Sequence, residues 1–331
     1  MSLEAIQKNV LDGMDEFVQE QLSLLKPVAD CWQPSDFLPD MTSAGWREDV
    51  QRIRDGAAGL TDETLVVLVG NLVTEEALPS YQTWLNRIDE IRDVTGADDR
   101  PWALWSRRWT AEENRHGELL TKYLYLAGRV DMRSVEITTQ NLIRNGFDLK
   151  SDNDAYQSLV YASFQERATK ISHANTGYLV EKCGDQVLAR ICSAIASDEA
   201  RHEEAYKRFF KEVARLDPSR AVIAFAAMMR KKVAMPARFM SDGVAADLFT
   251  QFAVTAQKSG VYTTRDYAEV VAHLLDYWGI PSMTGLFGAA AEARDYLCAL
   301  PGHFLSKADK TRDLLSRLPA EPFSWIFGRT A

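Results

Sequence analysis

The chain has 331 residues, of which 46% are hydrophobic and 26% charged, and a formal net charge of −9. This balance is typical of a globular protein with a large core, and the negative charge argues against general nucleic-acid binding, which needs a basic face. Four cysteines without a C-x-x-C pair indicate reduced thiols, and the longest apolar run, residues 221–229, is too short to span a membrane. We expect a soluble protein of a reducing compartment with no nucleic-acid or membrane partner.

Helical periodicity dominates the chain, which predicts an all-α fold. Pro79 is expected to kink one long helix, and Pro101 to open the next, because proline suits a first helical turn. The aromatic tail, residues 321–327, is expected to form a short hairpin or coil. The predicted helices span residues 3–25, 42–57, 61–94, 101–127, 132–144, 154–182, 185–216, 219–238, 243–258, 263–277, 283–300 and 303–318.

No Gly/Ser-rich linker divides these helices. We therefore expect one all-α domain over residues 1–331, built on a bundle at about 61–216 with additional helices around it.

Two Glu-x-x-His motifs lie in long predicted helices, Glu113 with His116 and Glu199 with His202. Residues three positions apart lie on one face of a helix, so each motif can direct a carboxylate and an imidazole at one point. A single match of this kind is weak evidence for a site, because a solvated helix face explains it equally well. Two matches in one chain justify a closer look at the helices around them.

Each motif follows a long predicted helix that carries another glutamate. Glu75 precedes Glu113 by 38 residues, and Glu166 precedes Glu199 by 33. In a four-helix bundle, four inward carboxylates and two imidazoles form a di-iron or di-manganese centre, and four carboxylates balance two divalent ions. At this stage Glu75 and its neighbour Glu76 are equal candidates. The predicted ligands are Glu113, His116, Glu166, Glu199 and His202, with either Glu75 or Glu76 as the sixth.

Two further residues follow from the helical geometry. Thr169 lies three positions after Glu166, so its hydroxyl either faces the same cavity, where it can hydrogen-bond a species bound at the metals, or bonds back to a helix carbonyl. Asp198 precedes Glu199 and either accepts a hydrogen bond from the far nitrogen of His116 or is a surface residue. The sequence leaves both pairs of alternatives open.

Several segments resemble the soluble, plant-type acyl-[acyl-carrier-protein] desaturases, in order and spacing, almost from end to end. The first glutamate of the family's Thr-Glu-Glu-Ala-Leu-Pro motif is a ligand, so the resemblance favours Glu75 over Glu76. The segments are residues 25–28 (LKPV), 31–40 (CWQPSDFLPD), 109–117 (WTAEENRHG), 164–169 (FQERAT), 198–202 (DEARH), 228–232 (MMRKK) and 322–327 (PFSWIF).

The resemblance implies a ferritin-like homodimer with two iron ions in each subunit. It implies the O₂-dependent insertion of a cis double bond into a saturated acyl chain on acyl carrier protein, in fatty acid biosynthesis, with electrons from ferredoxin. It also implies that Trp32 and Asp198 join His116 in a relay toward the surface. By the same resemblance the compartment is a bacterial cytoplasm or, for a processed chain, the plastid stroma.

The substrate path is less defined. A featureless acyl chain needs an apolar channel beside the metals, and the resemblance places the helix after Glu75 along it. Trp84 is bulkier than the aliphatic residue expected in stearoyl-specific plant enzymes, and Arg87 replaces a small polar residue, so chain length and bond position stay open. The candidates for this channel, with core packing as the alternative, are Tyr81, Trp84, Leu85 and Ile88.

Docking of an acidic carrier protein on this acidic chain requires a local basic patch. Favourable cations at a helix C-terminus are the alternative explanation for the same residues. The candidates are Arg230, Lys231, Lys232 and Arg238.

Three other functions share some of these features. A ferritin-like ferroxidase or other di-iron oxidase uses similar ligands, although the chain is much longer than a bare bundle needs. A radical-generating subunit needs a tyrosine near the metals, for which Tyr123, one heptad after His116, is a candidate. A non-catalytic helical scaffold would make the paired motifs an accident.

Overall fold

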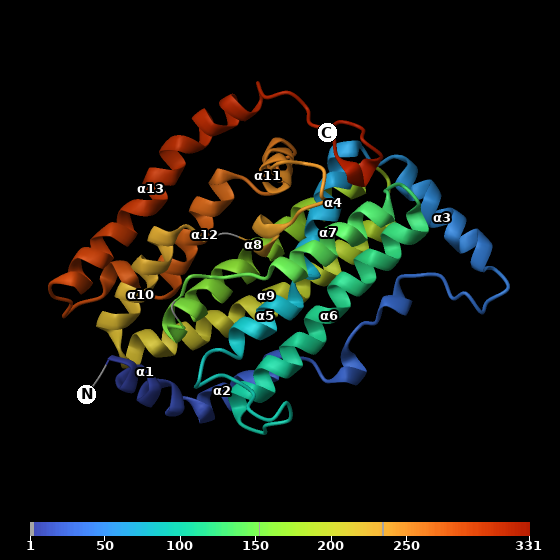
Figure 1. The fold of residues 1–331 in the computed structure, drawn as a ribbon. Helices are drawn as coiled ribbons and strands as arrows, with labels where there is room; N and C mark the ends of the chain where they lie inside the picture. Colours follow the sequence, from blue (N-terminus) through green and yellow to red (C-terminus); the bar gives the residue numbers. More distant parts are fainter. Residues whose placement is uncertain (1–2, 152, 234) are drawn as a thin grey trace.

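The computed structural model describes residues 3–151, 153–233 and 235–331 (Figure 1). It confirms the all-α class: within these ranges the β pairing consists of one isolated bridge between Pro322 and Thr330. The α-helices are α1 (Leu3–Asp12), α2 (Asp15–Gln21), α3 (Trp46–Ala58), α4 (Asp62–Glu75), α5 (Leu78–Leu85), α6 (Pro101–Ala127), α7 (Met132–Asn145), α8 (Ala155–Lys182), α9 (Gln186–Leu216), α10 (Pro218–Lys231), α11 (Leu248–Lys258), α12 (Thr264–Tyr277) and α13 (Ala289–Leu315).

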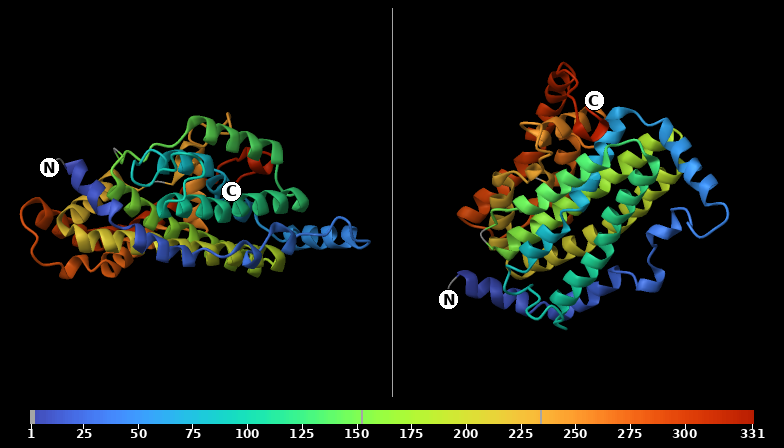
Figure 2. Two further views of the ribbon diagram at one scale, coloured as in Figure 1. Left: turned by 90° about the horizontal axis from the view of Figure 1, so that it is seen from below. Right: turned by 45° about the vertical axis from the view of Figure 1, so that its right-hand side comes forward.

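Helices α4, α6, α8 and α9 form the central bundle, and the other helices pack around it (Figure 1). Helix α8 lies against α9 over most of its length, α10 and α12 cover the α8–α9 side, and α13 packs on α10 and α12. Two further views show the N-terminal segment, from α1 to α3, running along one side of the bundle (Figure 2). One large hydrophobic cluster takes side chains from Leu11 to Ala331, so we still propose a single domain.

Helix α4 lies in the middle of the bundle, and its residues 64–75 are all buried. The expected cap at its start is present, since the Thr61 hydroxyl accepts a hydrogen bond from the backbone N–H of Thr64 at 3.2 Å. The expected continuous helix over residues 61–94 is wrong: α4 ends at Glu75 and α5 starts at Leu78. Pro79 explains the break, because a proline ring clashes with the carbonyl four residues before it, here that of Glu75.

Two other predicted boundaries are also wrong. The helix expected over residues 3–25 breaks at Gly13 into α1 and α2, since glycine costs about 1 kcal/mol in a helix interior. The helices expected over 283–300 and 303–318 are one helix, α13, which continues through Pro301. Its buried face continues on both sides of Pro301, from Leu297 to Ala308, so packing overrides the preference of proline to end a helix.

The ends of three other predicted helices shift. The segment predicted as 42–57 becomes helical only at Trp46, the one predicted as 219–238 ends at Lys231, and the one predicted as 243–258 starts at Leu248. The aromatic tail forms the expected short hairpin, closed by the Pro322–Thr330 bridge.

No single helix within the described ranges is both long and apolar enough to cross a membrane. The pair formed by α3 and the α4–α5 segment reaches that length and composition jointly, but it is bent by 116°.

Candidate metal centre

The six predicted ligands converge inside the bundle from α4, α6, α8 and α9. They form two groups, and within each group one ligand atom from every residue lies within 4.8 Å of the others. The groups share Glu113 and Glu199, so the geometry is that of two neighbouring metal positions with two carboxylates in common. The first group is Glu75, Glu113, His116 and Glu199, and the second is Glu113, Glu166, Glu199 and His202.

Helical spacing directs these side chains inward. On α6, the Nδ1 atom of His116 lies 3.2 Å from a carboxylate oxygen of Glu113, three residues earlier. The same Nδ1 atom lies 3.5 Å from Glu75 and 3.4 Å from Glu199, which come from α4 and α9. Glu76 points elsewhere, because it is half-buried and accepts a hydrogen bond from Thr121. The structure therefore separates Glu75 from Glu76, which the spacing alone did not.

Metal ions fit this arrangement. Glu113 Oε1, His116 Nδ1 and His202 Nδ1 are buried without a hydrogen bond of acceptable geometry, although Glu113 Oε1 and His202 Nδ1 lie 2.5 Å apart. Buried polar atoms without a hydrogen bond are rare in native proteins. All three atoms belong to residues of the two groups, where a cation would satisfy them. Four carboxylates and two neutral imidazoles suit two iron or manganese ions in both charge and ligand type.

The pKa values of the buried side chains also indicate that the centre favours positive charge. Burial raises the pKa of Glu166 well above its usual range, and the neighbouring carboxylates of Glu113 and Glu199 add to the rise. Burial by itself would lower the pKa of His202, but the carboxylates of Glu113 and Glu112 outweigh burial and raise it to about 9. The centre therefore attracts cations, either protons or metal ions.

The far side of His116 carries the residues expected there. Its Nε2 atom lies 3.5 Å from Asp198, which is fully buried and accepts a hydrogen bond from Arg115 at 3.0 Å. The Trp32 ring stacks on the His116 ring, with centroids 5.9 Å apart and planes inclined by 17°. The Arg115 guanidinium also lies over the Trp32 ring, with its Cζ atom 4.3 Å from the ring centroid. These contacts form a continuous path from His116 to the half-buried Trp32.

The corresponding partner of His202 is Glu112, which the sequence reasoning missed. The Nε2 atom of His202 lies 3.1 Å from Glu112 Oε2. Arg201 donates hydrogen bonds to both Glu112 and Asp198, at 2.6 and 2.5 Å, and so links the two acids. The signal was present in the sequence, because Glu112 has the same position in its motif as Asp198 in the other.

Thr169 combines the two alternatives that the sequence left open. Its hydroxyl lies 2.8 Å from Glu199 Oε2 and within 3.2 Å of the carbonyl oxygens of Gln165 and Glu166. One hydroxyl proton serves one acceptor at a time, so the side chain can turn between the helix and the centre. Thr169 also lines the cavity described next.

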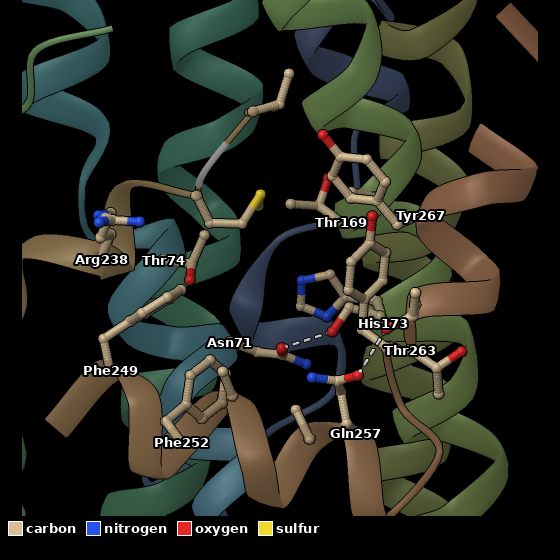
Figure 3. A pocket seen from close by; sticks show the side chains of 18 of the residues that line it. Asn71, Thr74, Thr169, His173, Arg238, Phe249, Phe252, Gln257, Thr263 and Tyr267 are labelled. Carbon is tan, nitrogen blue, oxygen red and sulfur yellow. Dashed lines mark hydrogen bonds between the residues drawn. The ribbon is translucent and has the colours of Figure 1, made fainter. Parts of the chain in front are cut away.

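An apolar cavity of about 410 Å³ extends from the centre between α4, α8, α11 and α12 (Figure 3). Glu75 and Thr169 belong to its wall, together with the rings of Phe249, Phe252 and Tyr267. The exposed cations Lys232 and Arg238 line it as well, which places a charged rim on an otherwise apolar space. The aromatic wall was not predicted from the sequence, because α11 and α12 come far after the bundle.

The residues expected to form the substrate channel lie elsewhere. They are buried between α5, α6 and α8 and do not line this cavity. Trp84 donates a hydrogen bond to Ser158 at 3.3 Å, and Tyr81 packs its ring edge-on against Trp109 and Phe147. Their role as channel residues stays a prediction for Tyr81, Trp84, Leu85 and Ile88.

The four docking candidates separate into two pairs. Lys232 and Arg238 line the cavity. The Arg230 guanidinium instead lies over the Tyr296 ring at 4.6 Å, and Lys231 donates a hydrogen bond to Gln157 at 2.9 Å. Tyr123, the candidate for a radical, is buried with its hydroxyl donating a hydrogen bond to Asp185, outside both ligand groups.

Four bundle helices that bring two Glu-x-x-His motifs and two further glutamates to one point define the class of ferritin-like di-metal carboxylate proteins. The comparisons with known proteins specify the class further. The family described as "Fatty acid desaturase" matches residues 6–327, and the chain belongs to this family. Within it, the chain is of the plant-type acyl-[acyl-carrier-protein] desaturase kind.

Two relatives show how close this similarity is. The "Stearoyl-[acyl-carrier-protein] 9-desaturase, chloroplastic" of Olea europaea is 49% identical, covering 99% of this chain and 84% of the relative. The "Acyl-[acyl-carrier-protein] 6-desaturase" of Thunbergia alata is 47% identical, covering 97% of this chain and 83% of the relative. The crystal structure of DesA2 from Mycobacterium tuberculosis shares the fold, with a TM-score of 0.57 and 17% identity, covering 87% of this chain and 99% of that one.

Proposed function

We propose that this chain is an acyl-[acyl-carrier-protein] desaturase of fatty acid biosynthesis, an oxidoreductase that inserts a cis double bond into a saturated acyl chain at a di-iron centre. The observation that carries the proposal is the cavity: an apolar space whose wall includes Glu75 of the centre and Thr169 beside it. Its shape and lining suit a hydrocarbon chain held next to the ligands.

The six converging side chains would hold two iron ions, with Glu113 and Glu199 common to both positions. Once bound, the iron supplies the oxidising power of O₂ that breaking an unactivated C–H bond requires, and no side chain can supply it. Asp198 and Glu112 would fix the orientation of the two imidazoles from their far sides. Glu112 is hydrogen-bonded to His202 Nε2 at 3.1 Å, and Asp198 lies 3.5 Å from His116 Nε2.

The cavity wall would bind and orient the substrate. Phe249, Phe252 and Tyr267 would confine the acyl chain and keep water away from the reacting carbons. The Thr169 hydroxyl, at the end of this wall, can donate a hydrogen bond toward the centre or return to its own helix. Lys232 and Arg238 would receive the acidic carrier protein at the rim.

The finer assignments rest on the resemblance of the motifs. We propose ferredoxin as the electron donor, O₂ as the oxidant and a homodimer as the assembly, with Trp32, Asp198 and His116 as the relay from the surface. The relatives are named as chloroplastic, which supports the plastid stroma; a bacterial cytoplasm offers the same reducing conditions. The two relatives named as 9- and 6-desaturases are almost equally similar, so bond position has to be measured.

The test is a panel assay. Iron-loaded protein is given carrier-protein thioesters of different chain lengths with ferredoxin, its reductase, NADPH and O₂, and double bonds are located by mass spectrometry. We expect an unsaturated product that disappears when the His202→Ala variant replaces the wild type. No product from protein that holds two irons per chain would reject the desaturase function, and oxidation of excess Fe²⁺ without acyl oxidation would favour a ferroxidase.

A further inference from the structure

Glu75 differs from the other five candidate ligands in its place on the helix. It is the last residue of α4, which has 14 residues and is followed by the break before α5. The other five lie within α6, α8 and α9, which have 27 to 31 residues. A helix end frays more easily than its interior, so Glu75 needs support that the other ligands obtain from their own helix.

A third buried histidine provides a contact at this point. His173 is 1% exposed, and its Nε2 atom lies 2.7 Å from Glu75 Oε1. It lies on α8 seven residues after Glu166, two helical turns along the same face, and belongs to neither ligand group. An ionised carboxylate only accepts hydrogen bonds, so the imidazole donates through Nε2–H. The other oxygen of Glu75, Oε2, faces His116 at 3.5 Å.

Hydrogen bonds of Asn71, one turn before Glu75, join α4 to α8. The Asn71 amide donates a hydrogen bond to the Thr176 hydroxyl at 3.1 Å. The Ser172 hydroxyl donates to the side-chain amide oxygen of Asn71, Oδ1, at 2.8 Å. These residues flank His173 along α8, and Figure 3 shows Asn71 and His173 side by side at the cavity wall. The backbone of α8 on both sides of His173 is therefore held against α4 beside Glu75.

We infer that His173 is a positioning residue for the metal centre: its Nε2–H holds Glu75 Oε1 and thereby turns Oε2 toward the position shared with His116. The inference rests on the proposed di-metal function. His173 itself holds no metal in this role. Its Nδ1 atom is buried without a hydrogen-bond partner, and the residue lines the cavity.

Two variants that replace His173 by an amide side chain distinguish a positioning role from a general packing role. In His173→Gln the amide nitrogen takes the place of Nε2 and can still donate to Glu75, whereas the shorter His173→Asn side chain cannot reach it. Thr176→Val is the control, because it removes the acceptor of the Asn71 hydrogen bond between the same two helices without touching Glu75. The unfolding midpoint of each metal-free protein is measured first, so that metal binding is compared between folded samples.

The metal-free proteins are then titrated with Co²⁺, whose visible bands report both positions, and with Fe²⁺ under anaerobic conditions. In His173→Asn we expect one of the two binding steps to weaken by about 10- to 100-fold, as for other outer partners of metal ligands, and the other step to stay unchanged. His173→Gln should remain within a few-fold of wild type, and Thr176→Val should match it.

Two results would overturn the positioning role: wild-type binding at both steps in His173→Asn, or equal weakening in His173→Asn and Thr176→Val. A wild-type protein that binds neither metal would instead reject the proposed function itself, so the two failures are distinguishable.

Discussion

The Nε2 atom of His202 lies 3.1 Å from Glu112, the residue directly before the glutamate of the other Glu-x-x-His motif. The relationship is reciprocal, because the Nε2 atom of His116 faces Asp198, which precedes Glu199, at 3.5 Å. Helices α6 and α9 are thus paired crosswise: each carries two candidate ligands and places a carboxylate beside the far nitrogen of the histidine on its partner.

This crosswise pairing predicts equal roles for the two acids. Glu112→Gln and Asp198→Asn should each lower metal affinity by about 10- to 100-fold, because each removes the charge that orients one imidazole. Anaerobic Fe²⁺ titration measures the effect. Glu118→Gln is the control, since Glu118 lies on α6 but pairs with Lys122 at the surface. A loss in Asp198→Asn without one in Glu112→Gln would contradict the symmetry.

If the cavity holds the acyl chain, filling it should lower desaturation without loss of bound iron. Ala253 lines the cavity from α11, so Ala253→Phe should fill part of it and lower desaturation at least tenfold while two irons remain bound. The neighbouring Val254 does not belong to the wall, and Val254→Phe should keep most of the activity. Product yield and iron content are measured on the same samples. Full activity in Ala253→Phe would place the acyl chain elsewhere, with Trp84 and Ile88 as the next candidates.

The rim cations predict a salt-sensitive docking defect. Lys232→Glu and Arg238→Glu should each raise KM for the acyl carrier protein by about tenfold, equivalent to about 1.4 kcal/mol, with a smaller change in kcat. Added salt should reduce the difference from wild type, because salt screens exposed charges. Lys310→Glu on α13 serves as the control for a charge change outside the rim. Unchanged KM in both rim variants would move the docking surface away from the cavity.

The C-terminal hairpin predicts a loss of stability in acid. Arg329 donates hydrogen bonds to both oxygens of Asp62, which hold the pKa of that carboxyl below its usual range. A folded-state pKa below the unfolded value means that this contact stabilises the fold above about pH 3.8 and is lost as pH falls through the folded-state pKa. Thermal unfolding from pH 6 to pH 3 should show a smaller decline in Asp62→Asn than in wild type. Equal declines would exclude a contribution from this pair.

The convergence of the six candidate ligands could be predicted from the sequence because helical geometry is local. The i, i+3 spacing of Glu113 and His116 already fixes which face of α6 they share, and the repeat of the unit predicts that four helices meet. The same repeat would have identified Glu112 had the role proposed for Asp198 been applied to both motifs. The structure adds the choice between Glu75 and Glu76, since a one-residue step on a helix decides which carboxylate faces inward.

The cavity and the role inferred for His173 could not be predicted from the sequence in the same way. Phe252 and Tyr267 line the cavity through tertiary packing of α11 and α12, for which the sequence carries no spacing signal. His173 lay outside any recognised motif, although its distance of seven residues from Glu166 was a usable hint. Pro301 misled the assignment of α13, because the local preference of proline was outweighed by a continuous buried face.

The α8–α9 pair has a consequence for how the protein is made. A turn of only a few residues, centred on Gly184, joins these helices, and their contact is the most extensive between helices in the described part of the chain. Contacts between segments close in sequence form early in folding, since little chain entropy is lost. This hairpin alone carries Glu166, Glu199 and His202. Three of the four candidate ligands of one metal position are thus expected to come together early in folding. Helix α6 then completes that position with Glu113, and α4 and α6 complete the other.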